Sequence, residues 1–154
     1  MAEEHQLEPL REAISRSKRA KFASGVPLEI VADAERHLRL KFPPSYRWWL
    51  LHYGAGYLNG CELQGLYPQK VAERDPHRAL SGDIIDLAHR NASSAHCPTH
   101  LLEFLSYEKD QAYFFDTEQS SPSGEWPIVR IANGNGKPEP VAESFAEFLV
   151  NQLS

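Results

Sequence analysis

The chain has 154 residues, of which 42% are hydrophobic and 24% are charged, as in an ordinary globular domain. No apolar run approaches the roughly 18 to 20 residues that span a bilayer, and the N-terminal MAEEHQLEPLREA lacks the apolar region of a secretory signal. Together with two cysteines far apart in sequence, these features argue against a membrane protein or a disulfide-rich secreted protein, and they favour one domain in a reducing cytoplasm.

The net charge of −5 is unevenly distributed. Residues 1–53 contain nine Lys/Arg and seven Asp/Glu, whereas residues 54–154 contain seven Lys/Arg and fourteen Asp/Glu. An acidic second half disfavours nucleic acid as a partner, because phosphate binding needs basic groups. It either favours a basic protein partner or is a solvated surface that keeps the chain soluble.

Three helices are expected in the first third of the chain. The stretch 7–21 carries apolar residues at helical spacing and is broken by Ser24-Gly25. A second helix begins near Pro27, which suits a first helical turn, and ends before Phe42-Pro43-Pro44. Ser45 is a candidate cap for the third helix, which Gly54 and Gly56 end. Their apolar faces are Leu7, Leu10 and Ile14; Ile30, Val31, Ala34 and Leu38; and Tyr46, Trp49, Leu50 and Tyr53.

Trp48 lies on a second side of the third helix. Large aromatic side chains are usually buried, so packing between layers is the simpler interpretation. The alternative is that Trp48 is left exposed as a contact for another molecule.

The remainder of the chain changes to the period of strands. Expected strands lie within 57–67 around an Asn59-Gly60 turn and at 101–107, 111–117, 126–132 and 141–142; a short helix is expected at 83–91. Asn133-Gly-Asn-Gly reads as a tight turn. Ser144 and Glu147 form a capping box that opens a last helix bearing Phe145, Phe148, Leu149 and Leu153. This order predicts an α+β fold with a largely antiparallel sheet.

Two groups of residues could carry enzyme chemistry. His96, Cys97 and His100 are zinc-ligand types, but no second Cys/His pair stands at finger spacing, so a polar loop is the simpler interpretation. Cys61 or Cys97 could act as a nucleophile beside a histidine base, yet neither has the sequence context of known cysteine enzymes, and buried free cysteine is commoner. The sequence therefore predicts no catalytic residue, no cofactor and no metal ligand.

Acidic residues cluster at Glu108, Asp110, Asp116, Glu118 and Glu125. They could do acid–base catalysis, they could be exposed turn residues at the rim of a sheet, or they could form an acidic patch facing a basic partner.

The segment 35–56, E-x-x-L-x-L-x-F-P-P-S-Y-x-x-W-L-L-x-Y-G-A-G, resembles the SMI1/KNR4 family, also called the SUKH superfamily. SYEKDQAYFFDT at 106–117 is similar to a strand pair of that family, and SFAEFLVNQL at 144–153 is similar to its closing helix. The departures are Gly-Ala-Gly in place of Asn-Gly-Gly, and the absence of a glycine-rich approach to the middle strand. The resemblance spans roughly 28–154.

The resemblance implies a curved, mostly antiparallel sheet packed against N-terminal helices and a C-terminal helix. It implies one domain over 1–154, of which 1–25 is expected to be an N-terminal helical extension. Bacterial members are commonly immunity proteins of polymorphic toxin systems, which bind and block a cognate toxin, often a nuclease. Fungal members are binding hubs in cell-wall signalling.

We therefore expect a non-enzymatic, cytoplasmic immunity protein, monomeric or weakly dimeric, that binds a toxin with a basic surface and binds neither nucleic acid nor membrane. The candidate contact residues are Glu108, Asp110, Asp116, Glu118 and Trp48. The alternatives are a regulatory or ligand-binding hub domain and an enzyme that uses the His96, Cys97 and His100 loop.

Overall fold

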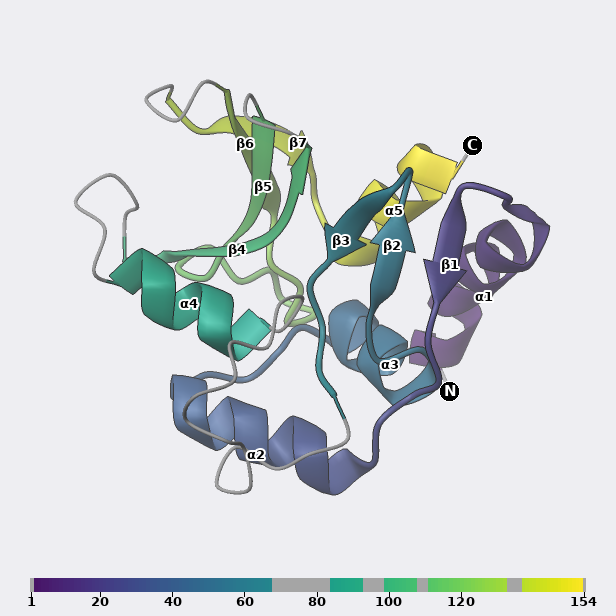
Figure 1. The fold of residues 1–154 in the computed structure, drawn as a ribbon, viewed down its shortest axis with the longest axis horizontal. Helices are drawn as coiled ribbons and strands as arrows, with labels where there is room; N and C mark the ends of the chain where they lie inside the picture. The colour runs from purple at the N-terminus through teal and green to yellow at the C-terminus, as the bar shows by residue number, and fades with distance from the viewer. Residues whose placement is uncertain (1, 68–83, 93–98, 108–110, 133–136, 154) are drawn as a thin grey trace.

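The fold was taken from a computed structural model, which describes residues 2–67, 84–92, 99–107, 111–132 and 137–153 (Figure 1). The helices are α1 (Ala2–Arg16), α2 (Leu28–Leu38), α3 (Pro44–His52), α4 (Ile84–Ala92) and α5 (Phe145–Leu153). The strands are β1 (Ala20–Phe22), β2 (Gly56–Leu58), β3 (Cys61–Leu63), β4 (Leu101–Tyr107), β5 (Gln111–Asp116), β6 (Ile128–Ala132) and β7 (Glu139–Ala142). None of the helices in these ranges is long and apolar enough to cross a membrane.

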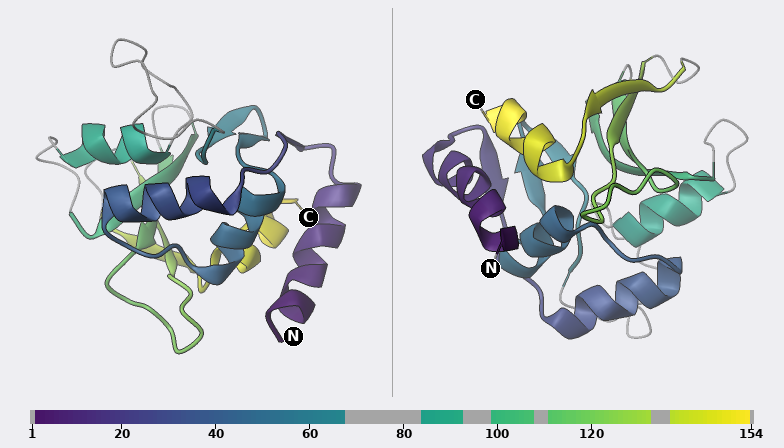
Figure 2. Two further views of the ribbon diagram at one scale, coloured as in Figure 1. Left: turned by 90° about the horizontal axis from the view of Figure 1, so that it is seen from below. Right: turned by 180° about the vertical axis from the view of Figure 1, so that it is seen from behind.

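The seven strands form one open antiparallel sheet in which every strand pairs with the next along the chain. The pairing between β3 and β4 is short, with Leu63 opposite Leu105, and there the sheet bends (Figure 1). Helix α5 lies in the angle between β1–β3 and β4–β7, with α1 packed against it, while α2 and α4 lie side by side (Figure 2). The predicted α+β fold with a curved antiparallel sheet is confirmed.

An aromatic core fills this angle. Tyr46 of α3 is fully buried, and its ring lies 5.0 Å from both Phe115 of β5 and Phe145 of α5. Its hydroxyl donates a 2.6 Å hydrogen bond to the carbonyl of Gln64, just after β3. The apolar body of this side chain is removed from water while its polar tip keeps a partner, so one residue links α3, α5 and both parts of the sheet.

Strand β5 is buried on both faces from Tyr113 to Asp116. Tyr113 and Phe115 face the aromatic core, whereas Phe114, between them, belongs to a second cluster with Leu101, Val129 and Ile131. Alternate residues of a strand point to opposite faces, which explains why this near-continuous apolar run is one strand with two packed sides.

The expected turn at Asn59-Gly60 joins β2 to β3. Asn59 has φ +52° and Gly60 has φ +82°, and two successive positive φ angles are what the tightest hairpin turn requires. Apart from α1 and β1, the other strands and helices also form within or close to the expected segments, and Ser144 and Glu147 open α5 as predicted. Asn133-Gly-Asn-Gly lies outside the described residues.

The prediction of a helix through 7–21 is wrong at both ends, because α1 begins five residues earlier, at Ala2. Helix α1 stops at Arg16, and residues 20–22 form β1, the edge strand paired with β2. Phe22 then packs edge-on against Trp49, with ring centroids 5.4 Å apart. Strand pairing and this contact outweigh a helical preference that has no large apolar side chain to bury between Ile14 and Lys21. The stretch 1–25 is therefore part helix and part sheet.

Candidate partner-binding groove

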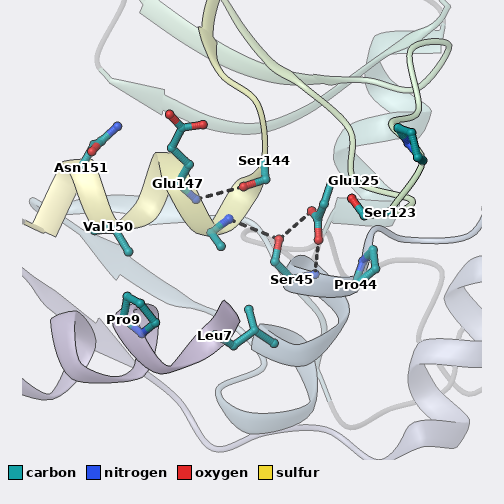
Figure 3. Close-up of a pocket in the computed structure, with 12 residues that line it drawn as sticks. Leu7, Pro9, Pro44, Ser45, Ser123, Glu125, Ser144, Glu147, Val150 and Asn151 are labelled. Carbon is teal, nitrogen blue, oxygen red and sulfur yellow. Dashed lines mark hydrogen bonds between the residues drawn. The ribbon is translucent and has the colours of Figure 1, made fainter. Parts of the chain in front are cut away.

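A groove of about 620 Å³ lies where α1, α5, the start of α3 and the segment between β5 and β6 meet (Figure 3). Its walls come from four parts of the sequence that the fold brings together. The lining residues are Leu7, Pro9, Pro44, Ser45, Pro122, Ser123, Glu125, Ser144, Ala146, Glu147, Val150 and Asn151.

The base of the groove is built by Ser45 and Glu125. The Glu125 carboxylate accepts hydrogen bonds from the Ser45 backbone N–H, at 2.9 Å, and from its hydroxyl, at 2.8 Å (Figure 3). Ser45 is the second residue of α3, whose first-turn N–H groups have no partner within the helix. A carboxylate there satisfies an orphan donor and interacts favourably with the positive end of the helix dipole.

Ser45 also connects α3 to α5. Its hydroxyl oxygen accepts a 3.2 Å hydrogen bond from the backbone N–H of Ala146, in the first turn of α5. The sequence suggested Ser45 as a cap of its own helix. Instead Pro43 occupies the cap position of α3 without a side-chain bond, and Ser45 caps the helix one hundred residues downstream. One hydroxyl thus fixes the relative position of two helices that border the groove.

The α5 side of the groove begins with the predicted capping box. Ser144 accepts the backbone N–H of Glu147 at 3.1 Å, and the Glu147 carboxylate accepts the backbone N–H of Glu143 at 2.8 Å. This return bond reaches one residue further back than the usual box. Glu147 remains exposed, so it presents a negative charge at the rim.

The groove combines apolar walls with negative charge. Pro9, Pro44, Pro122 and Val150 provide rigid or branched apolar surface, and Glu125 and Glu147 are its charged lining residues. No lysine, arginine or histidine is among the described residues that line it. Such a surface favours a ligand with an apolar body and a positive group.

Of the acidic residues singled out from the sequence, the structure describes Asp116, Glu118 and Glu125, and these three differ in exposure and in contacts. Glu118 is exposed and begins the segment that leads to the groove. Asp116 is 7% exposed, and its carboxylate accepts the Glu118 backbone N–H, so its side chain organises the turn after β5. Glu108 and Asp110 lie outside the described residues.

A further acidic side chain, Glu139 on the edge strand β7, is already paired. It accepts a 2.7 Å hydrogen bond from Arg130 on β6, and this bond with the charge of Glu139 raises the pKa of Arg130. The negative charge of Glu139 is therefore balanced by Arg130, whereas no basic residue is among the described residues that line the groove.

Trp48 is half-buried and packs against the main core. Its ring is tilted by 31° against that of His52, with centroids 4.6 Å apart, and the guanidinium carbon of Arg11 lies over the ring, 5.5 Å from its centroid. These contacts join α3 to α1 and favour the structural interpretation of Trp48. A partner would reach only the part of the ring that stays exposed.

Of the cysteines and histidines considered for enzyme chemistry, Cys61 and His100 lie in different parts of the described structure, and the others are outside the described residues. Cys61 is a partly buried free thiol of β3 that packs against the main core. His100 lies in the turn before β4, where its carbonyl accepts hydrogen bonds from Thr117, and His96 and Cys97 are outside the described residues.

Glu35 explains part of the distinctive motif. It is buried at the end of α2, where its carboxylate accepts the Phe42 backbone N–H at 2.7 Å and a bond from Arg47 at 3.2 Å. Because the carboxylate bonds to residues on both sides of the Pro-Pro turn, it fixes the orientation of α3 relative to α2. The motif marked Glu35, and Glu125 was noted only as one of the clustered acidic residues. Nothing in the sequence indicated the Ser45–Glu125 or Ser45–Ala146 bonds, since the partners are 80 and 101 residues apart.

A comparison with known protein families gives a match over most of the chain. A family model described as SUKH_6, SMI1-KNR4 cell-wall, matches residues 29–149. The match covers most of the chain and runs from α2 to α5, including the Glu35 bridge, the aromatic helix and the whole sheet from β2 onward. The chain therefore belongs to the SMI1/KNR4 (SUKH) superfamily.

Proposed function

We propose that this protein is a non-catalytic immunity protein that neutralises a cognate toxin by binding it through the groove between α1 and α5. Membership of the SMI1/KNR4 superfamily is consistent with this role. The observation that carries the proposal is the composition of the groove, which has apolar walls, two carboxylates and no basic lining residue among those described.

The proposed partner presents a basic segment with an apolar side chain. Toxins that act on nucleic acid carry positive surfaces, because they must bind phosphates. Glu147 and Glu118 would attract such a surface from solution, and burial of apolar area against Pro9 and Val150 would supply most of the affinity. The base, Glu125, already bonds Ser45, so it would contribute charge without moving.

The test is co-expression of this chain with the toxin encoded beside its gene. Asn151→Arg places a long cation in the groove from an exposed position of α5, and we expect it to abolish protection and weaken binding at least about tenfold. The matched control is Gln111→Arg, which adds the same group at an exposed site at the far end of β5. It should protect like the unaltered chain.

Titration calorimetry at increasing salt adds a second measurement. Affinity for the toxin should fall as salt rises, because the attraction between an acidic rim and a basic partner is screened. Full protection by the Asn151→Arg variant, or equal loss in both arginine variants, would contradict the groove as the contact site. Failure to bind any neighbouring toxin would contradict the immunity role itself.

The alternative function, a ligand-binding hub domain, is favoured by the size of the groove. A volume of about 620 Å³ lies within the range of small-molecule sites. A cationic, partly apolar metabolite that binds the unaltered chain but not Asn151→Arg, in a chain that protects against no toxin, would support this function instead.

A further inference from the structure

Two histidines from different helices meet on the side of the molecule formed by α2 and α4. The Nε2 atoms of His37, in the last turn of α2, and His89, in α4, are 2.7 Å apart. Their rings are nearly parallel, at 22°, with centroids 4.7 Å apart. Both side chains are exposed, and the packing of α2 against α4 holds them together.

In this geometry the Nε2 atoms of the two imidazole rings point toward the same small space between the helices. In the hydrogen-bonded pair, one ring carries its proton on Nε2 and the other offers a lone pair. If the donor ring carries its proton on Nδ1 instead, both Nε2 lone pairs face the same space, and both rings stay neutral. Neutral imidazole is the form that binds zinc-type cations.

We propose that His37 and His89 form a bridging site for a late first-row divalent cation such as Zn²⁺. Zinc binds histidine nitrogen at about 2.0–2.1 Å, so two nitrogens on one tetrahedral ion stand roughly 3.3 Å apart. The present separation of 2.7 Å would open by roughly 0.6 Å, within the reach of small rotations of two exposed side chains.

The remaining positions of the ion would be filled by water. No group of three or more His, Cys, Asp or Glu side chains within the described ranges is arranged to hold a metal ion. The site therefore has two protein ligands and would bind weakly compared with structural zinc sites, which use four. Its effect would be to fasten α2 to α4, because the second histidine binds at a high effective concentration once the first has bound.

The test is calorimetric titration of the full chain with zinc chloride at neutral pH. We expect His37→Gln and His89→Gln each to weaken this site at least about tenfold, because either change destroys the chelate. The double variant should bind zinc at most about twofold more weakly than either single variant. His52→Gln is the matched control, since His52 is exposed and its Nδ1 bonds the Trp48 carbonyl. It should bind zinc like the unaltered chain.

A urea titration with and without zinc supplies the second readout. Zinc should raise the unfolding midpoint of the unaltered chain and of His52→Gln, but not of His37→Gln or His89→Gln, because only a bridged pair holds two helices together. Unchanged zinc affinity in the two single variants would overturn the proposal. Losses that simply multiply in the double variant would also overturn it, because they would place the histidines in two separate sites.

Discussion

The aromatic core around α3 and the groove between α1 and α5 are built from opposite kinds of residue. The core uses Tyr46, Trp49, Phe115 and Phe145, all fully buried and in ring contact. The groove uses prolines, serines and glutamates, most of them partly or fully exposed. The family segments contribute to both regions. Their aromatic residues fill the core, whereas Pro44, Ser45 and the α5 residues of the groove come from the same segments, and Leu7, Pro9, Pro122, Ser123 and Glu125 come from outside them.

Substitution of two neighbouring tryptophans of α3 should give the largest difference in stability between a fully buried position and a half-buried one. Trp49 has no exposed surface and contacts Phe22, Tyr46 and Phe145. Trp49→Ala should lower the free energy of unfolding by about 3–5 kcal/mol, through lost burial and a cavity. Trp48→Ala, at a half-buried position, should cost about 1–2 kcal/mol. Urea unfolding measures both, and equal losses would contradict the assignment of Trp49 to the frame.

Two glycines with positive φ sharpen the comparison at the level of the backbone. At Gly54, with φ +77°, an added Cβ would lie 2.7 Å from the Ser24 carbonyl oxygen, so Gly54→Ala should cost about 2–3 kcal/mol. Gly60 has φ +82° but open space around it, so Gly60→Ala should cost only about 1 kcal/mol of conformational strain. The Gly54→Ala variant should therefore unfold at a lower urea concentration than Gly60→Ala. A lower midpoint for Gly60→Ala would show that the β2–β3 hairpin, and not the exit of α3, is the tighter turn.

Glu125 joins the two regions, because it lines the groove and caps α3. Glu125→Ala should lower stability by about 1–3 kcal/mol, since the Ser45 N–H and hydroxyl lose their acceptor. Glu125→Gln keeps an amide oxygen and should cost less. Exposed Glu118→Gln is the control and should change stability by under about 0.5 kcal/mol. A Glu125→Ala variant as stable as the control would mean that the base of the groove is not fixed by this carboxylate.

Replacement of Pro9 should have the smallest effect on stability, and it should stabilise the protein where the other substitutions destabilise it. It lies inside α1 and on the wall of the groove. A proline within a helix removes a backbone hydrogen bond and crowds the preceding turn, so Pro9→Ala should raise the free energy of unfolding by about 1 kcal/mol. The same change should weaken toxin binding in calorimetry by removing a rigid wall. A loss of stability would show that Pro9 serves the packing of α1 on α5 rather than the groove.

Much of the fold follows from local sequence, and the exceptions are informative. The helices α2, α3 and α5 were placed by apolar spacing and caps, and the β2–β3 turn by Asn59-Gly60. Strand β1 was missed because three residues at 20–22 become a strand only by pairing with β2. Of the contact residues chosen from charge, Glu118 is exposed and Asp116 is buried, since charge alone does not report burial.

The sequence by itself determined the family, through its motifs. It also determined the α+β class and the apolar faces of the helices, because periodicity, turns and caps are short-range properties of neighbouring residues. The tertiary structure alone decided where the groove lies, that Ser45 caps α5, that Glu125 caps α3 and that His37 meets His89. Each of those contacts joins residues 50 or more positions apart. A hydrogen bond or a shared surface at that separation exists only once the packing of helices on the sheet has fixed both partners in space.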